Sequence, residues 1–150
     1  MALIRDGKAI EDRFTLVTAE ADWTESDGLL VDLALWQSQR DALLASGRPL
    51  GLKLGSDEHP DTVIADIEHF ASIALEFPVF RDGRAYSYAR LLRRAGYTGE
   101  LRAVGDVLLD QLHYMQRVGF DAFEIDAEDP EAAYKQAQSE FSVWYQPAGD

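Results

Sequence analysis

Cysteine is absent from the 150-residue sequence. Its absence excludes disulfides, zinc or iron–sulfur centres held by thiolates, haem attached through thioethers, and a thiol nucleophile. The sequence also lacks a dinucleotide fingerprint, a Walker loop, a nucleophile elbow and a zincin motif. None of the three histidines has further ligands at a metal-like spacing, so we expect no metal site. The residues alone leave the cofactor unknown.

Basic residues are scarce, because 14 lysines and arginines stand against 27 acidic residues and give a net charge of −13. A field of this sign repels phosphate backbones and anionic lipids, so we expect neither nucleic acid nor a membrane as partner. No apolar run approaches the ~20 residues that cross a bilayer. The N-terminal stretch reaches a charge at Arg5 without forming an apolar signal region. These features predict a cytoplasmic protein.

The rest of the composition is that of a globular domain, with 47% hydrophobic and 27% charged residues. The Asp6-Gly7 pair between two β-prone runs predicts an N-terminal hairpin within residues 1–18. Apolar runs of strand length then alternate with segments of helical periodicity. We expect strands at 50–54, 72–77, 101–104 and 120–125, helices at 29–46, 61–69, 85–95, 107–118 and 129–143, and a flexible tail at 146–150.

The expected helices are long enough to connect parallel strands as crossovers. The sequence therefore predicts a single α/β domain over residues 1–150. Its sheet should be mostly parallel, with about four βα units and the N-terminal β-hairpin. Periodicity does not determine strand order, so an open sheet and a partial barrel both stay open. In either architecture, ligands bind beyond the carboxyl ends of the parallel strands.

Arginines gather in one segment near such strand ends. Residues 81–102 carry six of the fourteen basic residues, all of them arginine, and only two acids. Arg81 and Arg84 stand at the start of a predicted helix, whose first N–H groups also favour anions. A guanidinium is a planar donor fork suited to carboxylate, phosphate, sulfate or sulfite. The pattern predicts an anion site, with the alternative that the later arginines only solvate the outer helix face.

Other polar residues fall near the same strand ends. Lys53 interrupts a short apolar strand, which indicates either an edge strand or a partner for its charge. Asp106 follows a predicted strand and is the candidate catalytic acid or base, or else the cap of the next helix. The candidate ligand-binding residues are Lys53, Arg81, Arg84, Tyr86, Ser87, Arg90, Arg102 and Gln111.

An acidic stretch precedes and begins the last predicted helix. Six acids and no basic residue lie between Asp121 and Glu131. The stretch lacks the glycine and the ligand spacing of an EF-hand loop. It is typical of a solvated edge or of a docking surface for a basic partner.

Two stretches are distinctive as sequence motifs: Phe80 to Arg93 (FRDGRAYSYARLLR) and Leu101 to Leu112 (LRAVGDVLLDQL). They resemble a bacterial family catalogued as domain of unknown function 934, and the resemblance extends from about Leu29 to Phe123. Members of that family are described as oxidoreductases of sulfite reduction, because their genes often neighbour the sulfite reductase gene. The resemblance implies a role in sulfur assimilation. Its motifs carry over as a site Arg81, Arg84, Tyr86, Ser87, Arg90, Arg102, Asp106 and Gln111.

Two functions follow from the residues and the resemblance together. In the first, the chain is an accessory protein of assimilatory sulfite reduction that docks onto sulfite reductase or its electron donor through its acidic surface. In the second, it is an enzyme or binding protein that holds an anionic small molecule or cofactor at the arginine-lined mouth. Without cysteine, a redox reaction at that mouth needs a bound flavin or nicotinamide. The number of subunits stays open, and a homo-oligomer is one alternative.

Overall fold

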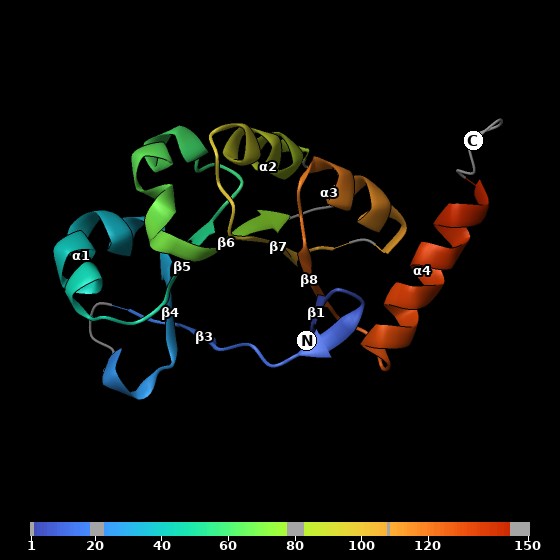
Figure 1. Ribbon diagram of the computed structural model, residues 1–150, viewed down its shortest axis with the longest axis horizontal. Coiled ribbons are helices and arrows are strands. Elements are labelled where there is room, and N and C mark those ends of the chain that lie inside the picture. Colours follow the sequence, from blue (N-terminus) through green and yellow to red (C-terminus); the bar gives the residue numbers. More distant parts are fainter. Residues whose placement is uncertain (1, 19–22, 78–82, 108, 145–150) are drawn as a thin grey trace.

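The computed structural model describes residues 2–18, 23–77, 83–107 and 109–144. In this part of the chain, eight strands form one sheet in the order β2-β1-β8-β7-β6-β5-β4-β3 (Figure 1). The strands are β1 (Ala2–Arg5), β2 (Lys8–Ile10), β3 (Phe14–Leu16), β4 (Gly28–Asp32), β5 (Leu50–Leu54), β6 (Phe70–Phe77), β7 (Glu100–Gly105) and β8 (Ala122–Ile125). The α-helices are α1 (Leu33–Ala45), α2 (Arg84–Arg94), α3 (Leu112–Val118) and α4 (Pro130–Trp144), and the 3-10 helices are η1 (Trp23–Glu25), η2 (Pro60–Thr62), η3 (Ile64–His69) and η4 (Leu109–Gln111).

The sheet is mixed. Neighbouring strands from β3 to β8 are parallel, whereas β1 pairs antiparallel with both β8 and β2. The α/β class is confirmed at this coarse level, but the expectation of a mostly parallel sheet with about four βα units is wrong. Two features account for the difference. The N-terminal hairpin extends the sheet beyond β8, and residues 28–32 form a further strand beyond β5.

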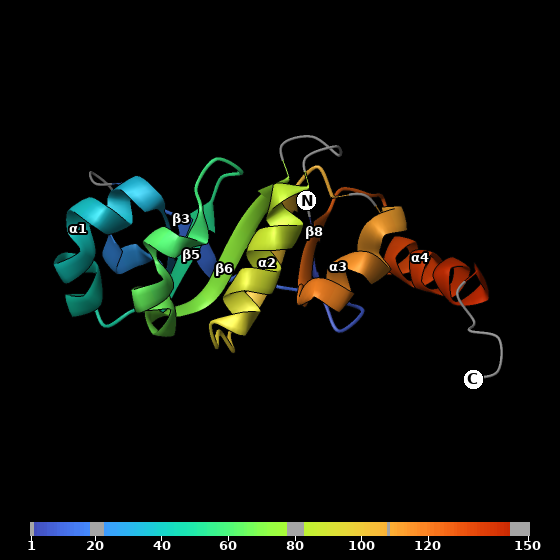
Figure 2. The same cartoon turned by 90° about the horizontal axis from the view of Figure 1, so that it is seen from above.

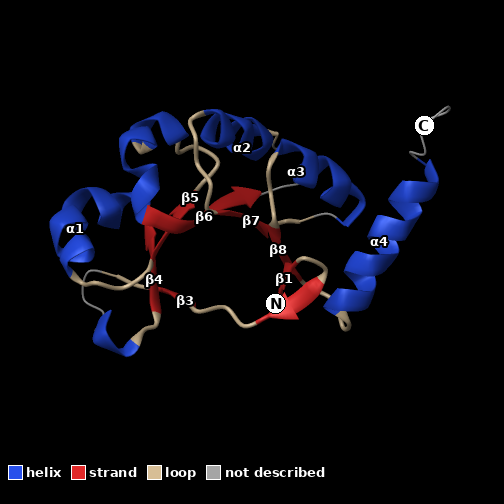
Figure 3. Cartoon of the chain, in the orientation of Figure 1, coloured by secondary structure: helices blue, strands red, loops and turns tan. Residues whose placement is uncertain are grey.

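The sheet curls into an open half-barrel (Figures 1 and 3). Curling follows from the twist of adjacent strands, which accumulates across a wide sheet. Helices α1, α2 and α3 lie along the convex face, and α2 runs beside β6 (Figure 2). The main core lies between these helices and alternate strand residues, among them Val31, Leu52, Leu75, Leu101 and Phe123. The concave face of the described sheet carries no helix (Figure 3).

The segment expected as one helix at 29–46 is divided between β4 and α1. Leu29 and Val31 are both fully buried in the core, an alternation that a strand allows and that the helical spacing of the later leucines obscures. The helix begins only after Asp32, whose carboxylate accepts a hydrogen bond from Leu35 N at 2.8 Å.

The other elements agree with expectation to different degrees. The hairpin is confirmed, because Asp6 (φ 55°) and Gly7 (φ 78°) both adopt the left-handed conformation that a type I′ turn needs. The helix expected at 61–69 is two 3-10 helices, and its first cap is His59, whose Nδ1 accepts from the backbone N–H of Asp61. The helix expected at 107–118 is α3, preceded by η4. The expected flexible tail lies outside the described residues. Within the described part, none of the helices combines the length and the apolarity needed to cross a membrane.

Candidate functional site at the carboxyl ends of the strands

The carboxyl ends of β6 and β7 meet at one rim of the half-barrel. Phe77 and Gly105 are register partners, and Asp106 N donates to Phe77 O at 2.7 Å. Gly105 has φ +86°, and a Cβ on it would lie 2.6 Å from Phe77 O, so only glycine allows this approach. The turn after β7 therefore opens at the same rim as the carboxyl end of β6.

Arg84, the first residue of α2, lies at this rim and is exposed. Its Nη2 donates to Ser56 Oγ at 3.2 Å, in the loop that follows β5. Tyr88 lies one turn further along α2, and its hydroxyl donates to Ser56 O at 2.7 Å. The Tyr88 ring also meets the His59 ring edge-on, with 5.3 Å between centroids. These contacts hold the start of α2 against the end of β5.

Tyr86 and Arg90, two of the predicted ligand-binding residues, pack against α3. The Tyr86 ring lies edge-on to Phe77 at 5.1 Å and to Tyr114 at 4.8 Å between centroids. Arg90 donates from Nη2 to Tyr114 Oη at 3.0 Å and lies over that ring. Burial raises the pKa of the Tyr86 hydroxyl, and the nearby Tyr114 and Asp110 raise it further, so this hydroxyl remains a hydrogen-bond donor at neutral pH. Both predicted residues thus join α2 to α3 beside the rim.

Arg102 lies on the concave face, away from the rim, and its side chain is 3% exposed. Its Nε donates to Glu100 Oε1 at 2.8 Å, and its Nη1 donates to Asp12 Oδ2 at 2.9 Å. Glu100 also accepts from Ser72 Oγ at 2.9 Å and from Arg5 Nη1 at 3.1 Å. Because two carboxylates already bind this guanidinium, Arg102 ties the segment before β3 to the middle of the sheet.

Lys53 lies on the same concave face and level with Arg102 in the strand register, but it is the penultimate residue of β5, whereas β7 continues for three residues beyond Arg102. β5 pairs with both β4 and β6, so the edge-strand explanation of this lysine is wrong. The charge has a partner, because Lys53 Nζ is 3.4 Å from Glu76 Oε2. Sequence reasoning missed Glu76. The alternation of apolar residues in β6 could have indicated it, since Glu76 interrupts the run at a position that faces away from the core.

The remaining candidates differ in how far the structure describes them. Asp106 is exposed at the rim and does not cap α3, whose first flanking residue is Gln111. Ser87 and Gln111 are exposed, on α2 and η4 respectively. Arg81 lies outside the described residues. The part of the chain that the structure describes contains no group of three histidines or acids that could hold a metal ion.

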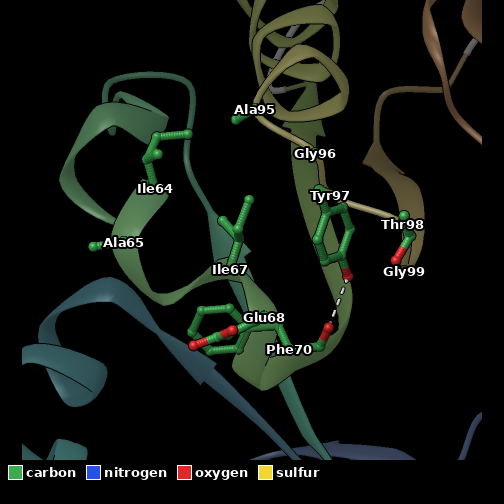
Figure 4. Close-up of a pocket in the computed structure, with 10 residues that line it drawn as sticks. All are labelled: Ile64, Ala65, Ile67, Glu68, Phe70, Ala95, Gly96, Tyr97, Thr98 and Gly99. Atoms are coloured by element: carbon green, nitrogen blue, oxygen red, sulfur yellow. Dashed lines mark hydrogen bonds between the residues drawn. The ribbon is translucent and has the colours of Figure 1, made fainter.

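A pocket of about 480 Å³ opens at the opposite ends of the strands, between η3 and the turn that follows α2 (Figure 4). Its floor includes Phe70 and Tyr97, both almost completely buried. The Tyr97 hydroxyl donates to Phe70 O at 3.1 Å, and burial raises its pKa. None of the predicted site residues lines this pocket. The candidate site therefore remains the carboxyl-end rim.

Comparison with protein families finds one match. The model of DUF934, described as a bacterial protein of unknown function, matches residues 51–150, which is two thirds of the chain. This match confirms the resemblance carried by the stretches Phe80 to Arg93 and Leu101 to Leu112, although it begins further along the chain than about Leu29. A comparison with curated proteins finds no match. The matched part contains the rim residues Lys53, Ser56, Glu76, Arg84 and Asp106.

Proposed function

The chain belongs to the DUF934 family of bacterial proteins of unknown function, and we propose that it is an accessory protein of sulfite reduction that binds a small anion at the carboxyl-end rim of its sheet. The pathway rests on the resemblance, since members of the family are described as proteins of sulfite reduction. The binding chemistry rests on the rim itself.

One observation carries the binding proposal: the exposed Arg84 at the start of α2 lies within hydrogen-bond distance of the Ser56 hydroxyl, in the loop that follows the carboxyl end of β5. Arg84 is exposed, so a dissolved anion can reach its guanidinium. The Ser56 hydroxyl beside it can donate a hydrogen bond to the same anion. The first N–H groups of α2 add positive potential at this point. Sulfite, sulfate and phosphate match this set of donors.

Thermal unfolding in the presence of anions tests the binding proposal. Sulfite at 100 times its dissociation constant should stabilise the protein by about 2.7 kcal/mol, whereas sodium chloride at equal ionic strength should not. Arg84→Ala should lose most of this stabilisation. Arg94→Ala is the matched control, because it removes the same charge from the exposed last residue of the same helix. The proposal fails if sulfite, sulfate, phosphate and flavin mononucleotide all leave the unfolding temperature unchanged, or if the two variants behave alike.

A second function has its own observation. Asp126, Glu128 and Asp129 are exposed directly after β8, at the same rim. Within the described residues, Asp126 and Glu128 have no basic partner, and Asp129 accepts from Ala132 N at the start of α4. Unpaired negative charge of this kind steers a basic partner protein toward the surface. Sulfite reductase or its electron donor is the partner that the resemblance implies.

Binding to purified sulfite reductase and to its electron donor, measured at low and at high salt, tests this second function. Neutralising Asp126, Glu128 and Asp129 to their amides should abolish salt-sensitive binding and keep the α4 cap. Neutralising Asp27, Asp41 and Glu68 in the same way makes the control, because it removes equal charge from exposed residues elsewhere. Undiminished low-salt binding of the first variant would count against docking through this surface.

A further inference from the structure

A second cation lies at the rim, on the concave side of the sheet. We infer that Lys53 binds an anion. In the unliganded protein the Glu76 carboxylate pairs with Lys53 Nζ, and a bound anion takes the place of this carboxylate. This inference rests on the proposed anion-binding function and identifies the residue that receives the anion from the concave side.

The position of the pair is the first argument. Lys53 is the penultimate residue of β5, and Glu76 is the penultimate residue of the neighbouring β6. Ala74 in β6 is the register partner of Lys53. Glu76 therefore lies on the same face, two residues closer to the carboxyl end of β6. Side chains at the carboxyl ends of parallel strands are where ligands of curled α/β sheets are bound.

The contrast with the other ion pairs of this face is the second argument. Arg102 and Glu100 are 3% and 9% exposed and are joined by directed hydrogen bonds, as a structural pair requires. Lys53 and Glu76 are 36% and 35% exposed, at an ion-pair distance of 3.4 Å. An ion pair this accessible to solvent contributes little to stability, typically about 0–1 kcal/mol. Stability therefore does not explain why a lysine interrupts an otherwise apolar strand.

Unused donors are the third argument. An ammonium group has three N–H donors. Within the described residues, Glu76 is the partner of Lys53, which leaves donors of Nζ for a ligand. Another acid beside Lys53 is Asp32, its register partner in β4, whose carboxylate accepts from the backbone N–H of Leu35. Glu76 is thus the carboxylate that competes with an incoming anion for Nζ.

Lys53 and Arg84 flank the same strand end. Ser56, which accepts from Arg84, follows Lys53 by three residues in the loop after β5. Arg84 contacts this loop from the convex face, which the helices cover, whereas Lys53 lies on the concave face. The two cations thus lie on opposite faces of the sheet at the end of one strand, where Glu58 already accepts from Gly55 N at 2.7 Å. Two cations favour a compact divalent anion such as sulfite over chloride.

The test measures the dissociation constant of sulfite by titration calorimetry at constant ionic strength. Removing the competing charge in Glu76→Gln should tighten binding about fivefold, and removing the ammonium in Lys53→Met should weaken it by at least about fivefold. Lys53→Arg, which keeps the charge, should bind about as well as the wild type. Glu124→Gln is the control, because it removes an equal charge from the same face two strands away and should leave the constant unchanged. Glu76→Asp, with its shorter side chain, replaces Glu76→Gln if that variant does not fold, and should also tighten binding.

The outcomes separate this inference from the proposed function. If sulfite binding requires Arg84 but is unchanged in Lys53→Met and Glu76→Gln, the inference is overturned and the proposed function stands. Weaker binding in Glu76→Gln would also overturn it, because the carboxylate would then support the anion site and not compete for it. If the wild type binds neither sulfite nor phosphate, the proposed function itself fails.

Discussion

Gly105 and Phe77 lie backbone to backbone where β7 leaves the sheet. The Phe77 carbonyl oxygen accepts from Asp106 N at 2.7 Å and would lie 2.6 Å from a Cβ at position 105. The same glycine has φ +86°. This approach holds the turn after β7 against the end of β6 and so shapes the rim on which the proposed anion site depends.

Gly105→Ala should therefore be strongly destabilising. A Cβ at this position meets both an unfavourable backbone conformation and the Phe77 carbonyl, so we expect the free energy of unfolding to fall by roughly 2–4 kcal/mol. Gly96→Ala is the control, because Gly96 has φ +99° but no atom within 4 Å of the added Cβ, and should cost about 1 kcal/mol. Urea denaturation at 25 °C measures both. Equal losses would show that the contact with Phe77 is not what requires glycine.

Local sequence predicted those parts of the fold that local chemistry determines. The Asp6-Gly7 turn and the apolar runs of β5 and β6 each depend on neighbouring residues, and each was predicted. The pairing of β1 with β8 joins residues more than a hundred positions apart, and nothing in either segment indicates it. Leu29 is four residues before Leu33, a spacing that also continues the buried stripe of the helix, which is why β4 was mistaken for helix.

The candidate site was predictable to the same extent. The rule that ligands bind at carboxyl strand ends selected Lys53, Arg84 and Asp106, and all three lie at or near that rim. The rule missed Glu76, because whether a charged strand residue has a partner depends on the neighbouring strand. Arg102 was predicted from the arginine-rich segment and from the resemblance, and it lies elsewhere, because one of its two carboxylate partners, Asp12, is 90 residues away in the sequence.

Arg102→Met should be among the most destabilising substitutions on the concave face. It leaves Glu100 buried without its main cation, and breaking one partner of such a pair costs about 3–5 kcal/mol. Asp12→Asn should cost less, about 1–2 kcal/mol, because Asp12 is 35% exposed and water can replace its contact. Arg94→Ala, at an exposed position, should change stability by no more than about 0.5 kcal/mol. Chemical denaturation gives the three values. A loss in Arg102→Met as small as that in Arg94→Ala would contradict a structural role for this arginine.

Two carboxyls provide a paired test of stability against pH. Burial raises the pKa of Asp66, but hydrogen bonds from Arg40 at 2.9 Å and from Trp36 at 3.1 Å outweigh it, and the pKa is lowered overall. Burial also raises the pKa of Asp121. There it prevails over the hydrogen bond from Leu101 N at 2.8 Å and over the more distant Arg93, and the nearby Glu100 raises the pKa further. The two pKa shifts therefore have opposite signs.

Asp66→Asn and Asp121→Asn should accordingly change stability in opposite directions at neutral pH. The lowered pKa of Asp66 means that its stabilisation is present above the unfolded pKa of about 3.9 and is lost as the pH falls through the folded pKa, so Asp66→Asn should be less stable than the wild type at pH 7. The raised pKa of Asp121 means that its favourable contribution is present below the unfolded pKa and is lost as the pH rises through the folded pKa. Asp121→Asn keeps an acceptor for Leu101 N without the half-buried charge, so it should be slightly more stable than the wild type at pH 7. Both differences should shrink toward zero as the pH is lowered to about 3, which urea denaturation across this range measures. A loss of stability at pH 7 in Asp121→Asn would show that its pairing with Arg93 outweighs the cost of burying its charge.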